Sequence, residues 1–549
     1  MFFHFVYFCF FHSYNLSLMK IPFLLLFYTL FFFCSACLFA QIQPAIAWQK
    51  TLGGPGNDII EDIYPTSDGN YILFALADSS GGDVAIDCQP HGIHDIWIFK
   101  MDPTGNIIWQ KCFGGSKEEG NPYSKIIQTS DGGYLFITES WSSDFDVEGH
   151  HAYSDAWTVK LDADGNLLWA KSFGGYIYDV PRNIYELPGQ KYMLLSRTTS
   201  SDGDVPPSID SVLSDAWVFI IDDEGNIVTN KIYGGTGDDS FFKALPTADG
   251  NIALFGLTSS TDGDLAGMGV DSTDGWMLII DTVGNIVSGK VYGGPNIEYF
   301  FDALNTPDGG YIAFGETGDP AAAVENGYWH GDQDYWAVKL AADGSVQWQG
   351  IYGGTEREQF RRAMALPDNS GFMLAGSTNS FDGDIINNTT DSARDWWRLQ
   401  IDENGVIYSS VALGGTGSDF AYAIAEPGIV VGGTFSDDGD VVDLDGTADG
   451  WVIQLSYATG IPSSPEYLQT LQVFPNPANS TVKLQMVDDL QPMRIEVRNA
   501  LGQLKHTLSE FSETATINVT DWVPGLYFIV VSLESGKTAP LVRSFEVVH

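Results

Sequence analysis

The chain has 549 residues, which is enough for more than one domain or for one domain built from repeats. Apolar residues make up 44% of it, so a sizeable core is available. Its 26 Lys and Arg residues stand against 71 Asp and Glu residues, giving a net charge of −45. Such a surface repels polyanions, which excludes nucleic acid and anionic membranes as partners, whereas cations, basic proteins and neutral sugars remain open.

Residues 1–40 are predicted to be a signal peptide. Residues 21–39 are mostly apolar, Lys20 supplies the positive charge before them, and Ala40 is a small residue at a suitable cleavage point. Residues 1–18 contain no Lys or Arg, so Met19 is an alternative start of translation. An N-terminal membrane anchor is the alternative interpretation, because the length of the segment allows it. Cys88 and Cys112 are the two cysteines beyond this segment, and one disulfide can form between them.

A unit of about 60 residues recurs seven times between residues 41 and 457. Its first marker is a Gly-Gly pair, with steps of 59 to 61 residues, and its second is Asp-x-Trp. So regular a period is typical of a repeat architecture. The pairs end at Gly54, Gly115, Gly175, Gly235, Gly294, Gly354 and Gly415.

Each unit is predicted to form four strands, A to D. In the fourth unit these are residues 240–246, 252–258, 274–281 and 286–292, with turns that contain Gly. Strand C is apolar on both faces, so it must be covered on both sides, as in a β-propeller. The seventh copy of strand D is not found after Trp451 but at residues 47–54. We therefore predict an all-β, seven-bladed propeller whose N-terminal strand closes the last blade; a straight solenoid would leave that strand unexplained.

After the repeats, residues 458–468 are predicted to be a linker, and residues 469–549 carry short alternating strands that predict a small Ig-like β-sandwich. This segment resembles the type A sorting domain of type IX secretion in Bacteroidota, and the repeats resemble those of secreted Bacteroidota propellers. The resemblance implies recognition by the type IX secretion machinery, export across the outer membrane, and release or surface attachment. An ordinary ligand-binding sandwich is the alternative. The residues that carry the resemblance include Pro475, Asn476, Pro477, Gly502, Gly525 and Tyr527.

In a blade of antiparallel strands, the B–C loops and the D-to-A steps open on one face, which we call the loop face, and the short A–B and C–D turns on the other, the turn face. The loops on the loop face are long and acidic and vary from unit to unit, so we expect a ligand to bind there. Two sets of acids recur on it. One acid follows each second Gly by four residues: Asp58, Glu119, Asp179, Asp239, Glu298, Glu358 and Asp419. The B–C loops add five Asp-x-Asp pairs: Asp144 with Asp146, Asp202 with Asp204, Asp262 with Asp264, Asp382 with Asp384, and Asp438 with Asp440.

These acids have two interpretations. Short oxygen-rich loops with Gly suit Ca²⁺, so the Asp-x-Asp pairs are candidate calcium ligands. Aspartate within a turn also bonds its own backbone without any metal, and recurrence in every blade favours this architectural role. No other cofactor is indicated. Three of the five propeller histidines also stand at a fixed repeat position, four residues before the Asp of Asp-x-Trp, which favours a structural role over a zinc site.

Aromatic residues off the repeat pattern are the candidates for ligand binding, because exposed flat rings form a platform for a sugar or a peptide: Tyr328, Trp329 and His330 in the fifth unit, and Trp141 in the second. The alternative is that these rings pack onto the rim of the blade. Nucleophile elbows, P-loops, dinucleotide fingerprints and zincin motifs are absent from the sequence. We therefore expect a monomeric, secreted or surface-attached propeller that binds a glycan or a protein. The alternatives are a carbohydrate- or peptide-active enzyme that uses acidic residues around the central channel, and a purely structural surface-layer component.

Overall fold

The computed structural model describes residues 46–455 except 86–87, 89, 208–212, 319–330, 368, 386–387, 389–392, 427 and 445, and residues 471–547 except 475–479, 487–491, 500–503, 509–513, 521, 523–524 and 534–540. The predicted signal peptide and linker lie outside these residues. Apart from a single 3-10 turn, Gly263–Leu265, the described elements are strands, and none of the described helical segments could span a membrane.

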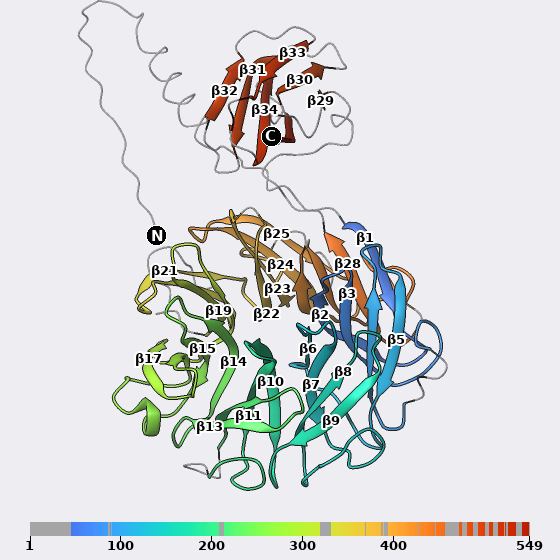
Figure 1. Cartoon of the computed structure of the whole chain (residues 1–549), viewed down its shortest axis with the longest axis vertical. Coiled ribbons are helices and arrows are strands. Elements are labelled where there is room, and N and C mark those ends of the chain that lie inside the picture. The colour runs from blue at the N-terminus through green and yellow to red at the C-terminus, as the bar shows by residue number, and fades with distance from the viewer. Residues whose placement is uncertain are drawn as a thin grey trace, which may run out of the picture. The chain divides into compact units, whose positions relative to one another are not determined.

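Seven four-stranded antiparallel sheets surround a common axis (Figure 1). In blades 1 to 6 the four strands follow one another in sequence order, A to D. Their bounds are, in blade 1, β2 (Asp58–Pro65), β3 (Tyr71–Ala77), β4 (Asp95–Met101) and β5 (Ile107–Phe113); in blade 2, β6 (Lys125–Gln128), β7 (Tyr134–Ser140), β8 (Asp155–Leu161) and β9 (Leu167–Phe173); in blade 3, β10 (Asp179–Leu187), β11 (Lys191–Thr198), β12 (Asp215–Ile221) and β13 (Ile227–Tyr233); in blade 4, β14 (Asp239–Pro246), β15 (Ile252–Thr258), β16 (Asp274–Ile280) and β17 (Ile286–Tyr292); in blade 5, β18 (Glu298–Asn305), β19 (Tyr311–Thr317), β20 (Asp334–Leu340) and β21 (Val346–Tyr352); in blade 6, β22 (Glu358–Ala365), β23 (Gly371–Thr378), β24 (Asp395–Asp402) and β25 (Ile407–Leu413).

Blade 7 confirms the predicted closure. Its strands β26 (Asp419–Ala425), β27 (Ile429–Thr434) and β28 (Asp449–Leu455) are completed by β1 (Ile46–Leu52), which pairs antiparallel with β28 from Leu52 opposite Gly450 to Ile46 opposite Leu455. The first and last strands of the propeller therefore share one sheet, and no edge of blade 7 is left open there.

The core lies between the faces of adjacent blades. The seven tryptophans of Asp-x-Trp are at most 2% exposed, because strand C is covered on both sides as its two-sided apolar pattern predicts. Cys88 and Cys112 form a disulfide, which ties the B–C loop of blade 1 to β5.

The innermost strands carry a β-bulge between the third and fifth residue in every blade except blade 2; in β2 it lies at Ile60/Asp62. Near these bulges, ion pairs connect the innermost strands of different blades across the central axis. Asp62 lies 3.2 Å from Lys125 of blade 2 and 3.5 Å from Arg362 of blade 6. Arg362 also lies 4.0 Å from Asp302, which Lys243 approaches to 2.8 Å. Arg362 therefore connects two buried acids of different blades.

The C-terminal segment forms two sheets, as a sandwich requires. One has the order β29-β30-β33 and the other β32-β31-β34-β35. The bounds are β29 (Leu471–Phe474), β30 (Thr481–Met486), β31 (Pro492–Asn499), β32 (Leu504–Leu508), β33 (Thr514–Asn518), β34 (Gly525–Leu533) and β35 (Leu541–Val547).

Candidate functional site

The acids that follow each Gly-Gly pair are buried between blades, and in every blade except blade 2 they begin strand A; in blade 2 Glu119 precedes β6. In blade 3, Asp179 Oδ2 accepts a hydrogen bond from the Gly175 backbone N–H (2.7 Å) and another from Ser200 Oγ (2.9 Å), and Thr198 Oγ1 donates to the other oxygen. The same bond to the second glycine recurs in the other six units, at Asp58, Glu119, Asp239, Glu298, Glu358 and Asp419. Each of these acids thus fastens the D-to-A step of its blade junction.

A second carboxyl lies beside each of them. The Asp of Asp-x-Trp approaches the first glycine so closely that a Cβ on Gly174 would lie 2.5 Å from Asp155 and 2.6 Å from Asp179. A side chain larger than hydrogen cannot fit here, which explains why the first Gly is present in all seven pairs. Burial, with repulsion from neighbouring acids, raises the pKa of Asp58 to about 7 and the pKa values of Asp179 and Asp239 to about 6.

The first Asp of each Asp-x-Asp pair holds the B–C loop against the D-to-A step. In blade 3, Asp202 Oδ1 accepts the Tyr176 backbone N–H (2.7 Å). The equivalent hydrogen bonds from the residue after Gly-Gly are accepted in the other pairs by Asp144, Asp262, Asp382 and Asp438.

The second Asp of each pair turns back onto the first glycine of Gly-Gly. Its backbone N–H donates to the glycine carbonyl, and its Oδ2 accepts the glycine N–H at 3.1 to 3.4 Å. In four of the five pairs the central residue is Gly at φ between 58° and 69°, a left-handed conformation that favours glycine. The second acids are Asp146, Asp204, Asp264, Asp384 and Asp440.

The structure does not gather the candidate calcium ligands into a metal centre. Among the described residues, no group of three or more His, Cys, Asp or Glu side chains is arranged to hold a metal ion. The physical reason is that both carboxylates of each pair already accept backbone N–H groups of their own blade junction, which is the turn-capping arrangement. Calcium binding stays a prediction for all ten: Asp144, Asp146, Asp202, Asp204, Asp262, Asp264, Asp382, Asp384, Asp438 and Asp440.

The histidines take part in the same loops. His91 Nδ1 lies 3.3 Å from Asp95, and His151 Nδ1 lies 3.0 Å from Asp155, both of which are acids of Asp-x-Trp. These contacts agree with the structural role that their fixed repeat position favours.

One predicted ligand-binding residue belongs to an aromatic cluster. The Trp141 ring meets Tyr178 (centroids 5.7 Å apart), Tyr178 meets Tyr153 (5.4 Å), and Tyr153 meets Tyr176 (5.9 Å). Tyr176 is 62% exposed, and Tyr153 and Tyr178 are also exposed. We call these four rings the aromatic platform; they lie on the loop face at the junction of blades 2 and 3. Tyr328, Trp329 and His330 lie outside the described residues.

Arginine is concentrated in two of the seven blades. All seven arginines of the propeller belong to blades 3 and 6: Arg182, Arg197, Arg357, Arg361, Arg362, Arg394 and Arg398. The guanidinium carbons of Arg182 and Arg361 lie 4.2 Å and 5.7 Å from the centroid of the same ring, Tyr123 of blade 2. Side chains from two separated blades therefore meet within the channel. Burial lowers the pKa of Arg182 to about 10, with a further contribution from the charge of nearby Arg197.

Two channel acids lie off the repeat pattern. Burial raises the pKa of Glu61 to about 8, although Ser124, Lys125 and Arg361 act in the opposite direction. Burial also raises the pKa of Glu316 to about 7; its carboxylate accepts hydrogen bonds from Tyr299 Oη (2.7 Å) and the Phe360 backbone N–H (3.0 Å).

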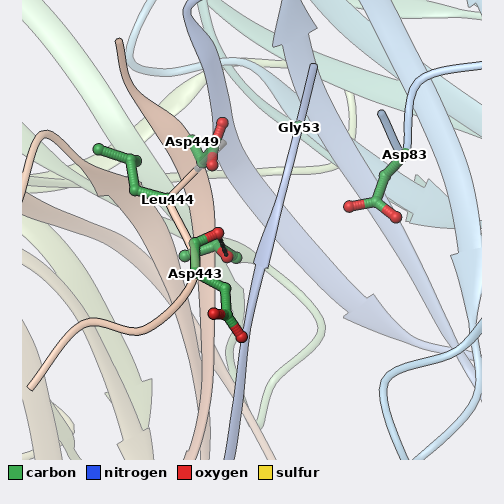
Figure 2. Close-up of a pocket in the computed structure, with 6 residues that line it drawn as sticks. Gly53, Asp83, Asp443, Leu444 and Asp449 are labelled. Carbon is green, nitrogen blue, oxygen red and sulfur yellow. Dashed lines mark hydrogen bonds between the residues drawn. The ribbon is translucent and has the colours of Figure 1, made fainter. Parts of the chain in front are cut away.

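A shallow pocket of about 420 Å³ lies where blade 7 meets blade 1. It is lined by Thr51, Gly53, Asp83, Asp443, Leu444 and Asp449, and Figure 2 shows Asp443 and Asp449 on one side of the Gly53 segment and Asp83 on the other. Blade 1 has Gly81 where five other blades have the first Asp of Asp-x-Asp.

The channel arginines and three of the four rings of the aromatic platform were not predicted from the sequence. The restriction of Arg to two of seven repeats is a signal that a repeat-by-repeat comparison could have found. The stretch Tyr176-Ile177-Tyr178 after the third Gly-Gly pair is a second such signal, because the other units lack two aromatic residues there.

Residues 472–541 match the family described as secretion system C-terminal sorting domain, which confirms the resemblance. Gly525 and Tyr527 lie on β34, whereas Pro475, Asn476, Pro477 and Gly502 lie outside the described residues. No curated protein matches this chain.

Several solved structures are similar in part. Hydrazine synthase of Kuenenia stuttgartiensis is 13% identical over 64% of this chain and 78% of that chain, with a TM-score of 0.35. A puromycin hydrolase is 13% identical over 82% of this chain and 64% of that chain (TM-score 0.42). PorZ, a surface component of the type IX secretion system of Porphyromonas gingivalis, is 10% identical over 89% of this chain and 81% of that chain (TM-score 0.19).

With TM-scores below 0.5, none of these three structures supports an assignment of function. The seven closed blades and the C-terminal match suffice for a class: the chain is a β-propeller protein with a type IX secretion sorting domain, exported to the cell surface or secreted.

Proposed function

We propose that the exported propeller is a binding module for a glycan, with the aromatic platform as its binding surface. The observation that supports this is the contiguous set of rings at Trp141, Tyr153, Tyr176 and Tyr178, of which the three tyrosines are exposed and Trp141 is half-buried. Large exposed aromatic residues cost free energy in water unless a partner covers them, and flat rings bury area at low entropy cost.

A neutral sugar suits this surface better than a charged partner. The apolar face of a sugar ring stacks on an aromatic ring without any ionic contact, so the net charge of −45 does not oppose it. A protein ligand would need a larger complementary area than four rings supply.

The test is a glycan array probed with the chain from Gln41 onward, followed by calorimetry on any glycan that binds. We expect the double variant Tyr153→Ala/Tyr178→Ala to weaken that binding at least tenfold. Phe381→Ala is the matched control, because Phe381 is an exposed aromatic residue in the blade 6 loop of the same face. Equal losses in both variants, or no glycan bound at all, would contradict the proposal.

A glycan- or peptide-cleaving enzyme is the second candidate, supported by the raised pKa values of Glu61 and Glu316 in the channel. This second candidate requires that the protein converts a bound substrate to product and that the Glu316→Gln variant no longer does so. Binding without turnover would leave the binding module as the function.

A further inference from the structure

The arginines at the loop-face mouth of the channel contact aromatic rings and not closely paired carboxylates. Arg361 contacts the rings of Tyr123 and Tyr422 (5.7 and 5.3 Å), and Arg182 contacts Tyr123 and Phe242 (4.2 and 5.3 Å). Among the described residues, no carboxylate is paired within 4 Å with either guanidinium. Glu139 acts electrostatically on Arg182, and Glu61 and Glu316 interact with Arg361, without such a close pair. Cation–π contacts alone replace only part of the hydration that a guanidinium loses.

The lack of a closely paired carboxylate costs the most free energy at Arg182, because this arginine is buried. Its side chain is 8% exposed, and its Nε has no hydrogen-bond acceptor within the described part of the chain. Arginine is almost never this buried without a paired anion. Arg357 Nε on the same face is a second buried donor without an acceptor there.

Arg394 continues the cluster toward solvent. It donates hydrogen bonds to two neutral groups, Gln359 Oε1 (2.9 Å) and Asn379 Oδ1 (3.2 Å), and lies 5.3 Å from the Phe420 ring. The charges of Arg357 and Arg361 lie near enough to lower its pKa further after burial has done so. Three positive charges therefore lie close together here, with Glu316 as a nearby acid that interacts with all three.

We propose that the arginines at this mouth, chiefly Arg182, Arg361 and Arg394, bind the carboxylate of a small ligand whose attached ring or apolar group packs on the neighbouring aromatic residues. Guanidinium groups match carboxylates in shape and donate paired hydrogen bonds to them. The rings of Tyr123, Tyr422 and Phe420 give the rest of the ligand an apolar contact. This site is separate from the aromatic platform, and it does not depend on glycan binding there.

A monocarboxylate fits better than a polyanion or a phosphate dianion. Glu61 and Glu316 interact electrostatically with Arg361, and Glu316 also with Arg394, so a higher negative charge would meet more repulsion. Two sources supply this chemistry, an acidic sugar and the C-terminus of a peptide.

Calorimetry on the chain from Gln41 onward, at about 0.15 M ionic strength to suppress non-specific attraction, tests the proposal. The probes are D-glucuronate and N-acetyl-L-phenylalanine, each beside its neutral amide, and inorganic phosphate. We expect one or both carboxylates to bind and their amides not to bind. Preference for glucuronate identifies an acidic sugar, and preference for N-acetylphenylalanine identifies a peptide terminus.

Arg361→Gln should weaken carboxylate binding about tenfold or more, because it removes charge-assisted hydrogen bonds. Arg361→Lys keeps the charge but not the planar fork, and it covers the case in which the glutamine variant does not fold. Lys290→Gln, on the exposed outer strand β17, and Tyr153→Ala/Tyr178→Ala are controls that should bind normally. Binding of neither carboxylate, phosphate binding as tight as theirs, or unchanged binding in both Arg361 variants would overturn the proposal.

Discussion

At the scale of single residues, the tryptophans of Asp-x-Trp show what the repeat requires. In five blades the indole N–H donates to a side chain on strand D thirteen residues later, or on β1 in blade 7: Gln110, Asn230, Gln349, Ser410 and Gln49. In the other two, Ala170 and Gly289 stand at that place, and the Nε1 atoms of Trp157 and Trp276 have no acceptor within the described residues.

Ala170→Gln should therefore stabilise the propeller by about 1 kcal/mol, because it supplies the acceptor that Gln110 supplies in blade 1. Gln110→Ala is the matched control and should destabilise by about 1–3 kcal/mol, because it leaves the Trp97 N–H without that acceptor. Thermal unfolding of the two variants beside the parent chain checks both signs. A destabilised Ala170→Gln would show that the site is too tight for the longer side chain.

The Asp-x-Asp pairs allow a test of capping against calcium. Asp202 already accepts the Tyr176 N–H, so we expect Asp202→Ala to lower the free energy of unfolding by about 1 kcal/mol in EDTA and in millimolar Ca²⁺ alike. Simple screening is held constant by about 0.15 M NaCl. A loss that occurs only with Ca²⁺ present would instead establish the calcium site, because a specific ion stabilises by mass action.

At the scale of strands and blades, the sequence alone predicts those features of the fold that recur in every repeat. The strands of the fourth unit, the blade count and the closing role of residues 47–54 followed from period and apolar pattern, and the structure confirms them. The channel could not be predicted in this way. Contacts such as that between Arg361 and Tyr123 join blades that are not adjacent, and they depend on which residue each bulge turns toward the axis.

Removal of β1 should break the ring at blade 7. A chain that starts at Gly56 loses the whole ladder with β28 and the hydrogen bond from Trp451 Nε1 to Gln49, leaving an open sheet edge. We expect it to aggregate, or to lose more than about 3 kcal/mol of stability relative to a chain that starts at Gln41, since several ladder bonds are worth about 1 kcal/mol each. Equal unfolding curves for the two chains would contradict the closure.

At the scale of the whole molecule, buried carboxyl pairs at the blade junctions make stability depend on pH. Asp58, Asp179 and Asp239 have folded-state pKa values of about 6 to 7, above those of exposed aspartates. A carboxyl whose pKa is raised by folding binds its proton more tightly in the folded state than in the unfolded chain. The stability that these carboxyls contribute is therefore greatest at lower pH and is lost as the pH rises through 6 to 7. We expect a higher melting temperature at about pH 5.5 than at about pH 8. Asp58→Asn should reduce this difference; a melting temperature that rises with pH would contradict it.

The last prediction concerns export. The propeller is closed by β1 and β28, and the chain passes Leu455 before the sorting domain begins, so removal of residues 465–549 takes no strand from any blade. The shortened protein should fold with an unchanged melting temperature but remain in the periplasm, because residues 472–541 carry the match to the sorting family. Phe381→Ala in the full chain is the control that should be exported normally.

Fusion of residues 465–549 to a periplasmic reporter should carry that reporter out of the cell. This result would show that the segment is a sorting signal and is not needed only for folding of the propeller. Surface exposure of the shortened protein, or retention of the fusion, would show that the information for export lies in the propeller instead.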